Sequence, residues 1–412
     1  MGYPEASYLP RNSLILFLLL FSVMLGKYHI YIGFAFKPYM MYLGILVFFL
    51  SAFFRFQKLQ VFEVLLLFFY LVYVFSGAFS LYATSSLRVM LGIILYVIFY
   101  IAMKGILGMF RKRELENGIA NAGILFNVGS LLLYVWGLKS NGFSLLGDGV
   151  IRYGAWFDRD YPRLIGLIED PNYFVFYNTL FFTFYLCKRD SWKNNFGLFL
   201  CLISSVLTFS RGGLLILMVI FMVYFILSKP ANQWRLFSST ISFLSIAWVA
   251  SYLLGFRVLD ILQNRFQDFS NDGGSGRLEL WGRAWDFFTS NPLFGIGASN
   301  FADYNAFKFG DELVVHNTFL EILTESGLIG LLIYVVFVFT VLFQIFKADF
   351  HKKHPFLFLT FLGFIFQMMF LSLIFNDMFL LFLAILSTYF SYEREIGLNN
   401  ENVRMIKEAG YR

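Results

Sequence analysis

Charged residues are scarce in this chain, and their scarcity excludes most classes of soluble protein. Only 14% of the 412 residues are Asp, Glu, Lys or Arg, whereas 59% are hydrophobic and 21% are aromatic. A soluble globular domain carries about 25% charged residues. The composition therefore excludes a soluble enzyme, a disordered tail and a solvent-facing repeat array. It predicts a membrane protein that crosses the bilayer several times.

Cysteine is also scarce, which excludes a disulfide scaffold. Cys187 and Cys201 lie in or beside apolar segments and lack metal-ligand spacing, so we expect no metal site and no cofactor. Asp158-Arg159-Asp160 has the Asp-x-Asp form that holds a divalent ion in other glycosyltransferases, but acidic loops produce such a triplet by chance. The net charge of +6 is expected to set membrane orientation, with no nucleic acid as a partner.

Apolar runs long enough to cross a bilayer recur along the whole chain. A spanning helix needs about 20 mostly apolar residues. We therefore predict an all-α polytopic membrane protein, a single integral membrane domain over residues 1–412 with about twelve transmembrane helices. These are expected at 13–26, 30–54, 60–80, 88–109, 118–138, 171–187, 194–210, 211–228, 236–254, 316–346, 355–371 and 373–390.

Lysine and arginine predict how these helices are oriented. Most of them fall in segments that alternate along the chain in the way expected of the cytoplasmic side. The N-terminus and a tail at 391–412 are then cytoplasmic, and two long loops, 139–170 and 255–315, lie on the outer face. The stretch from Arg277 to Phe288 in the second loop is amphipathic and predicts an interfacial helix.

Polar residues inside membrane spans are expensive, and here most of them fall at the outer helix ends. A polar site that opens outward beneath the two loops is therefore expected. Arginine suits phosphate, because its planar group donates two parallel hydrogen bonds. Histidine suits proton transfer near neutral pH. The residues concerned are Arg88, Asp170, Asn172, Arg211, His316, Asn376 and Asp377, with Glu321 and Glu325 deeper in the tenth span and Arg163, Arg277 and Arg283 in the loops.

Four motifs in a fixed order make the sequence resemble a known family. They are Arg163 to Asn172, Ser210-Arg211-Gly212-Gly213, Gly276 to Trp281 followed by Asn291 to Gly297, and His316 to Glu321 followed by Glu325 to Gly330. Together they resemble the O-antigen ligase and polymerase superfamily of bacterial surface-polysaccharide assembly, with a GT-C-like arrangement of helices. The motifs cover roughly residues 160–335.

The resemblance implies an inverting, metal-independent glycosyl transfer at the outer face of the bacterial inner membrane. The donor would be a glycan on undecaprenyl pyrophosphate, and the acceptor a glycan or a lipid-linked glycan among membrane lipids. Arg211 and Arg277 match the family's essential arginines, expected on the pyrophosphate, and His316 matches its proposed general base. Arg163 matches a further donor-side arginine.

The expected substrate-binding set is completed by residues whose roles stay open. Asn317 suits a helix cap or a support for His316, and Glu325 suits packing or the acceptor side. Asn172 and Arg88 lie at outer helix ends, and Asp377 could pair with an outer arginine. Gly327 and Gly330 suggest close helix packing.

Several functions remain in competition at this point. The leading one is a polymerase that joins polysaccharide repeat units, possible partners including a chain-length regulator. The closest alternative is a ligase that moves the finished glycan to lipid A core or another acceptor. A transporter or flippase would show inverted repeats and broken helices meeting at the midplane, which the sequence does not suggest. A non-catalytic scaffold would tolerate loss of His316 and Arg211.

Overall fold

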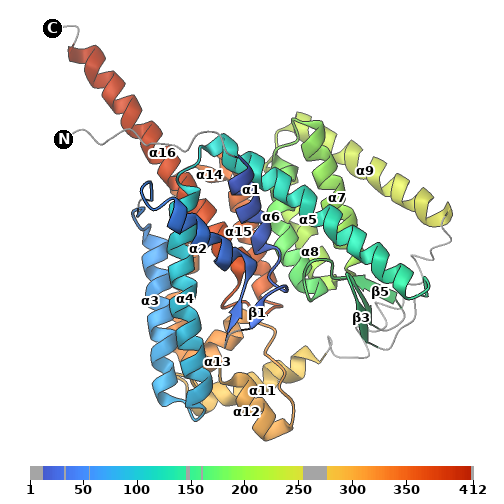
Figure 1. The fold of residues 1–412 in the computed structure, drawn as a ribbon, viewed down its shortest axis with the longest axis vertical. Coiled ribbons are helices and arrows are strands. Elements are labelled where there is room, and N and C mark those ends of the chain that lie inside the picture. Colours follow the sequence, from blue (N-terminus) through green and yellow to red (C-terminus); the bar gives the residue numbers. More distant parts are fainter. Residues whose placement is uncertain are drawn as a thin grey trace.

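The computed structural model describes residues 13–31, 34–54, 56–144, 149–158, 161–253 and 276–409, and it is predominantly helical. Helices recur where apolar runs predict them. Figure 1 shows them as a bundle in which α3 and α4 lie together on one side and α7, α8 and α9 on the other. The helices are α1 (Ser13–Val23), α2 (Pro38–Phe49), α3 (Val61–Ser76), α4 (Ala83–Leu107), α5 (Lys112–Ser140), α6 (Pro171–Cys187), α7 (Trp192–Leu207), α8 (Arg211–Leu227), α9 (Pro230–Leu253), α11 (Arg277–Ser290), α12 (Phe301–Phe309), α13 (Thr318–Lys347), α14 (Phe350–Lys353), α15 (Pro355–Met368) and α16 (Asp377–Ala409).

Part of the chain can be assigned to a membrane from length and composition. Within the described ranges, four helical segments are long and apolar enough to cross a bilayer: Val61–Phe79, Ala83–Leu107, Lys112–Ser140 and Thr318–Lys347. Other apolar helices, such as α8 and α15, are shorter than about 20 residues. The chain is therefore a helical membrane protein, and the count of twelve spans stays a prediction.

Two expected segments differ from the prediction. The run 30–54 is no single helix, because β1 (Ile30–Tyr31) and β2 (Ala35–Phe36) pair as an antiparallel hairpin before α2 begins. The last run does not end near residue 390. Helix α16 continues through the expected tail to Ala409, and Figure 1 shows its end projecting from the bundle.

The loop between α5 and α6 contains a second small sheet, so the fold is not entirely α. Strands β3 (Val150–Arg152), β4 (Ala155–Asp158) and β5 (Tyr161–Leu164) form an antiparallel sheet in that order. Trp156 is paired with Arg163 in the register of β4 and β5. All four residues of β5 are buried, and the sheet thereby fixes Arg163 at the end of the bundle.

Helix α6 forms the centre of the bundle. Nearly all of its residues are buried, and it packs against α5, α7, α8 and α15. A helix that is hydrophobic on every side is stable only when other helices surround it. Aromatic rings fill much of this core. The rings of Phe176 in α6 and Phe364 in α15, for example, stack with centroids 4.2 Å apart.

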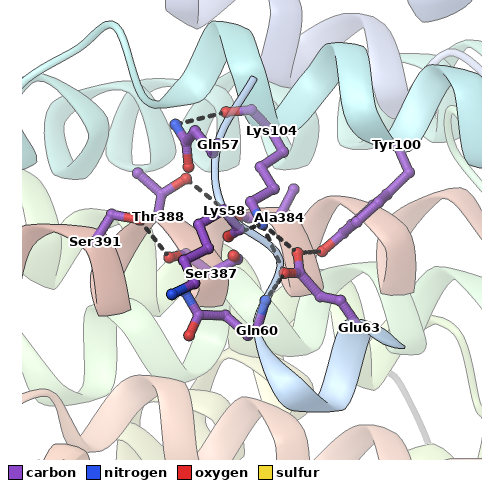
Figure 2. Close-up of polar contacts among 10 residues, drawn as sticks. All are labelled: Gln57, Lys58, Gln60, Glu63, Tyr100, Lys104, Ala384, Ser387, Thr388 and Ser391. Carbon is purple, nitrogen blue, oxygen red and sulfur yellow. Dashed lines mark hydrogen bonds and ion pairs between the residues drawn. The ribbon is translucent and has the colours of Figure 1, made fainter. Parts of the chain in front are cut away.

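A buried ion pair joins α3 to α4 at one end of the bundle (Figure 2). Lys104 Nζ lies 2.6 Å from Glu63 Oε2, and both side chains are almost completely buried. Lys104 also donates to the carbonyl of Lys58 at 2.9 Å, and Tyr100 donates to Glu63. The backbone N–H of Gln60 donates to the same carboxylate. The charges are therefore compensated by several hydrogen bonds, as burial in a low-dielectric interior requires.

Helices α11 and α12 form a small module below the bundle (Figure 1). It has its own apolar core, made of Leu280, Ala284, Phe287, Ile296, Phe301 and Val315. Arg283 supports it by pairing with Glu279 at 2.5 Å and Asp311 at 2.8 Å. The amphipathic helix expected from Arg277 is confirmed as α11. Residues 254–275 of the same predicted loop lie outside the described part of the chain.

Candidate functional site

The predicted polar residues gather at the opposite end of the bundle from the Glu63–Lys104 pair, which we call the site end. Helices α6, α8, α13 and α16 all begin here, each capped by a side chain. Asp170, Ser210, Asn317 and Asn376 accept hydrogen bonds from backbone N–H groups of the first turn. Helix N-termini carry partial positive charge and favour anions. The site end is therefore suited to an anionic ligand before any arginine is counted.

Arg163 is held by two neighbouring chain segments. Its Nε donates to the carbonyl of Thr208 at 3.0 Å, and its guanidinium lies 5.6 Å from the ring centroid of Trp156. Asn172 links it to the start of α8, because its Oδ1 accepts from Ser210 Oγ at 2.7 Å and from Arg163 Nη2 at 3.5 Å. Two of the predicted binding residues, Arg163 and Asn172, are thus in direct contact.

Arg211 and Arg277 come from elements far apart in the sequence and meet at this site. Arg211 is the first residue of α8, directly after the cap Ser210, and Arg277 is the first residue of α11. The pKa of Arg277 is lowered by burial and by the charge of Arg211, whereas the carboxylate of Asp170 raises it. We call Arg163, Arg211 and Arg277 the arginine cluster.

His316 faces the same groups. Burial lowers the pKa of its imidazole, the positive charge of Arg277 lowers it further, and Asp170 raises it. The ring is therefore held mainly neutral at pH 7, the form that can accept a proton. His316 has φ 54°, a left-handed conformation unusual for a residue with a side chain, and Phe209, two residues before Arg211, has φ 50°.

The backbone of His316 is fixed from two sides. Its N–H donates to Ser372 Oγ at 3.1 Å, and the preceding Val315 is buried in the module core. Trp281 in α11 donates to the carbonyl of Val315 at 3.2 Å. Ser372 also receives a hydrogen bond at its carbonyl from Tyr173 at 2.8 Å. These contacts hold the histidine between α11 and the start of α6.

Two of the sequence motifs form one structural unit. Helix α13 breaks at Gly327, which has φ 66° and ψ −167°, a conformation open only to glycine. The segment 291–297 docks in the break. Leu328 N donates to the carbonyl of Pro292 and Gly297 N to that of Glu325, at 2.9 and 3.0 Å. The packing expected at Gly327 is therefore packing of backbone on backbone. Gly330, one turn on, lies against Ser326 of its own helix.

Four more of the predicted residues also lie at the site end. Glu325 is buried, accepts from Tyr73 and from the N–H of Phe301 at 3.1 Å, and ties the module to α3. Asn317 caps α13 beside His316. Arg88 lies on the exposed side of α4 in a pocket that Lys37 and Asp377 also line. Asp377 was expected to pair with an outer arginine, and it pairs with Lys37 instead, at 2.5 Å.

Sequence reasoning assigned no role to Ser372 and did not single out Asp170 as an electrostatic partner. The Asp-Pro pair at 170–171 is a recognisable helix-start signal, so the cap on α6 could have been read. Nothing in the local sequence distinguishes Ser372. Arg283 was considered for the site and supports the α11–α12 module.

The described residues include no group of three or more His, Cys, Asp or Glu side chains placed to hold a metal ion. Asp158 ends β4, and Arg159 and Asp160 of the Asp-x-Asp triplet lie outside the described residues. Cys187 and Cys201 are free thiols.

Residues 196–335 match the sequence model of the O-antigen ligase family. The match covers about a third of the chain and includes Arg211, Arg277 and His316. It confirms the resemblance to the O-antigen ligase and polymerase superfamily, and it supports glycosyl transfer in surface-polysaccharide assembly. A comparison with curated proteins gave no match.

Proposed function

We propose that the protein transfers a glycan from undecaprenyl pyrophosphate to a sugar hydroxyl, at the outer face of the bacterial inner membrane. The observation that carries this proposal is that His316, Arg277, Arg211 and Asp170 lie close enough for their charges to interact, and that His316, Arg277 and Arg211 lie inside the segment that matches the O-antigen ligase family. A neutral histidine beside fixed guanidinium groups suits attack by a hydroxyl on a sugar with a phosphate leaving group.

The proposed reaction is a single displacement with inversion. His316 accepts the proton of the acceptor hydroxyl as its oxygen bonds to the anomeric carbon of the donor sugar. The bond from that carbon to the pyrophosphate oxygen breaks at the same time, and undecaprenyl pyrophosphate leaves with the negative charge. Arg211 and Arg277 stabilise this charge as it develops, and Arg163 supports them from β5. Interactions that strengthen in the transition state are those that raise the rate.

Asp170 has two roles in this scheme. Its carboxylate caps α6, and its charge stabilises the imidazolium that forms when His316 takes up the proton. A carboxylate whose charge stabilises the imidazolium of a catalytic histidine is a recurrent device in acyl transfer. Asp170 is thus a positioning residue.

We favour a polymerase that extends surface-polysaccharide repeat units, with a ligase as the alternative. The test is turnover with donor alone, using purified protein in lipid bilayers, an undecaprenyl-pyrophosphate oligosaccharide and a chelator. A ladder of longer lipid-linked glycans would support the polymerase. Transfer only after the addition of lipid A core would support the ligase.

Variants test the assigned roles in the same assay. His316→Ala, Arg211→Gln and Arg277→Gln should each abolish transfer while the protein still inserts and folds. His351→Ala in α14 and Arg113→Gln at the start of α5, which lie away from the site end, serve as matched controls and should retain activity. Full activity of His316→Ala, or of both arginine variants, would refute the mechanism.

A further inference from the structure

A second polar site lies at the site end, outside the arginine cluster, and is not used by the proposed mechanism. It is a pocket of about 460 Å³ between the hairpin, α2, α4 and the start of α16. Its wall along α4 is largely apolar. One end carries charged side chains. The residues that the argument uses are Lys37, Met40, Arg88, Gly92, Ile93 and Asp377.

The charged end carries a net positive charge. Lys37 is paired with Asp377, and Tyr39 also donates to that carboxylate at 2.9 Å. These two charges compensate one another. Arg88 is exposed in the pocket, and among the described residues it has no ion-pair partner. An anion fits beside Arg88, because a guanidinium binds phosphate oxygens through paired hydrogen bonds.

The apolar part of the pocket suits a hydrocarbon chain. Met40 in α2 and Ile93 in α4 line it, and a Cβ built on Gly92 would meet no atom within 4 Å. Helix α4 is one of the apolar helices that can cross a membrane, and many of its side chains are exposed on the same side of the helix as Leu91 and Ile94. The pocket therefore has the charge and apolar pattern of a lipid with a phosphate headgroup.

A neighbouring pocket extends from this site to Asp170. It has a volume of about 390 Å³ and shares Lys37 and Asp377 with the first. Its far wall includes Asp170 and Tyr173, whose charge and hydrogen bonds reach His316 and Ser372. Lys27 and Glu169 also line it. Such charged and polar groups bind sugar hydroxyls, so the second pocket suits a glycan.

We propose that the acceptor is a lipid-linked glycan that binds in these two pockets, with its phosphate at Arg88 and Lys37, its first lipid segment along Gly92 and its sugar directed toward His316. This inference rests on the proposed function and adds to it. The donor pyrophosphate lies on the arginine cluster, on the other side of Asp170. The two lipids would thus reach one histidine from different sides, which a transfer between two membrane-anchored substrates requires.

Gly92→Phe tests the lipid part without changing a charge. The new ring would fill the open space beside Gly92, and helix propensity favours phenylalanine over glycine. Gly44→Phe in α2 is the matched control, since Gly44 is also exposed in a helix with no atom near its Cβ but does not line the pocket. Arg88→Gln tests the phosphate part.

The first measurement is lipid binding by native mass spectrometry with undecaprenyl phosphate as the probe. Wild type and Gly44→Phe should bind two molecules. Gly92→Phe and Arg88→Gln should bind one, and Arg211→Gln added to Gly92→Phe should remove the remaining one. A parallel titration with lipid A distinguishes the source of the phosphate. If lipid A displaces undecaprenyl phosphate from the Arg88 site and not from the arginine cluster, the Arg88 site binds the acceptor of a ligase, which also supports the pocket as the acceptor site.

The second measurement is transfer with a fixed, saturating donor and a varied acceptor. Arg88→Gln should raise the KM for acceptor about tenfold or more, the loss expected for one charge-assisted phosphate contact. Gly92→Phe should also raise the KM for acceptor, because its ring occupies the space of the lipid segment. The KM for donor should be unchanged in both variants. Wild-type lipid binding and wild-type acceptor KM in both variants would overturn the inference. If wild type itself shows no transfer with an authenticated donor, the proposed function fails. The number of lipid molecules bound by each variant still tests whether the pocket binds a lipid.

Discussion

Replacing Gly327 by alanine should separate the break in α13 from the segment that docks in it. A Cβ at this position would lie 2.2 Å from the carbonyl oxygen of Leu293, and the φ of 66° with ψ −167° is open only to glycine. The two backbone segments cannot move apart without breaking the hydrogen bonds that Leu328 and Ile329 donate to the carbonyls of Pro292 and Leu293. The perturbation is therefore steric and conformational at once.

The magnitude follows from two parts. An alanine held in this conformation costs about 1–3 kcal/mol. Displacement of the docked segment breaks the hydrogen bonds from Leu328 and Ile329 to the carbonyls of Pro292 and Leu293, each worth about 1 kcal/mol. We expect a loss of about 3–5 kcal/mol in the free energy of unfolding.

The assay is thermal unfolding of the purified protein in bilayer discs, with glycosyl transfer measured on the same sample. Gly327→Ala should lower Tm by several degrees. It should also reduce transfer, because segment 291–297 follows α11, which carries Arg277, and is hydrogen-bonded to α13, the helix that follows His316. The matched control is Gly282→Ala in α11, where the added methyl group meets no atom within 4 Å. Equal Tm and equal activity of Gly327→Ala and Gly282→Ala would refute the reasoning.

Two further predictions concern charge. Asp170→Asn keeps a cap on α6 but removes the charge that raises the pKa of His316, so the pKa of His316 falls and its base form persists to lower pH. The acid limb of the pH–rate profile should therefore shift toward lower pH. A shift toward higher pH would contradict this prediction. Lys104→Met leaves Glu63 buried and unpaired and should destabilise the protein by about 3–5 kcal/mol. The double variant with Met at positions 63 and 104 should recover most of the lost Tm. No recovery would show that the unpaired charge of Glu63 is not the cause of the destabilisation.

Much of the helix series could be predicted from composition and periodicity. An apolar run of about 20 residues has few alternatives to a helix in a lipid environment, because its backbone polar groups must bond within the segment. This reasoning found α3, α4, α5 and α13. It failed at residues 30–36, where the same apolar character accompanies a hairpin, since two short strands and a buried helix cannot be distinguished by hydrophobicity alone.

Local motifs also identified most of the candidate site. Arg163, Asn172, Arg211, Arg277 and His316 were selected from residue chemistry and motif order, and the structure brings them to one end of the bundle. Helix starts explain part of this success, because a capping residue such as Ser210, directly before Arg211, can be recognised from the sequence.

The sequence by itself determined the class of protein, the residues suited to phosphate and proton transfer, and the helix starts that carry them, because these depend on composition and on neighbours within a few positions. Only the tertiary structure decided that Ser372 fixes the backbone of His316, that the break at Gly327 receives segment 291–297, and that Arg88 shares a pocket with Lys37 and Asp377. Each of these depends on contacts between segments distant along the chain, and no local pattern of residues specifies such a contact.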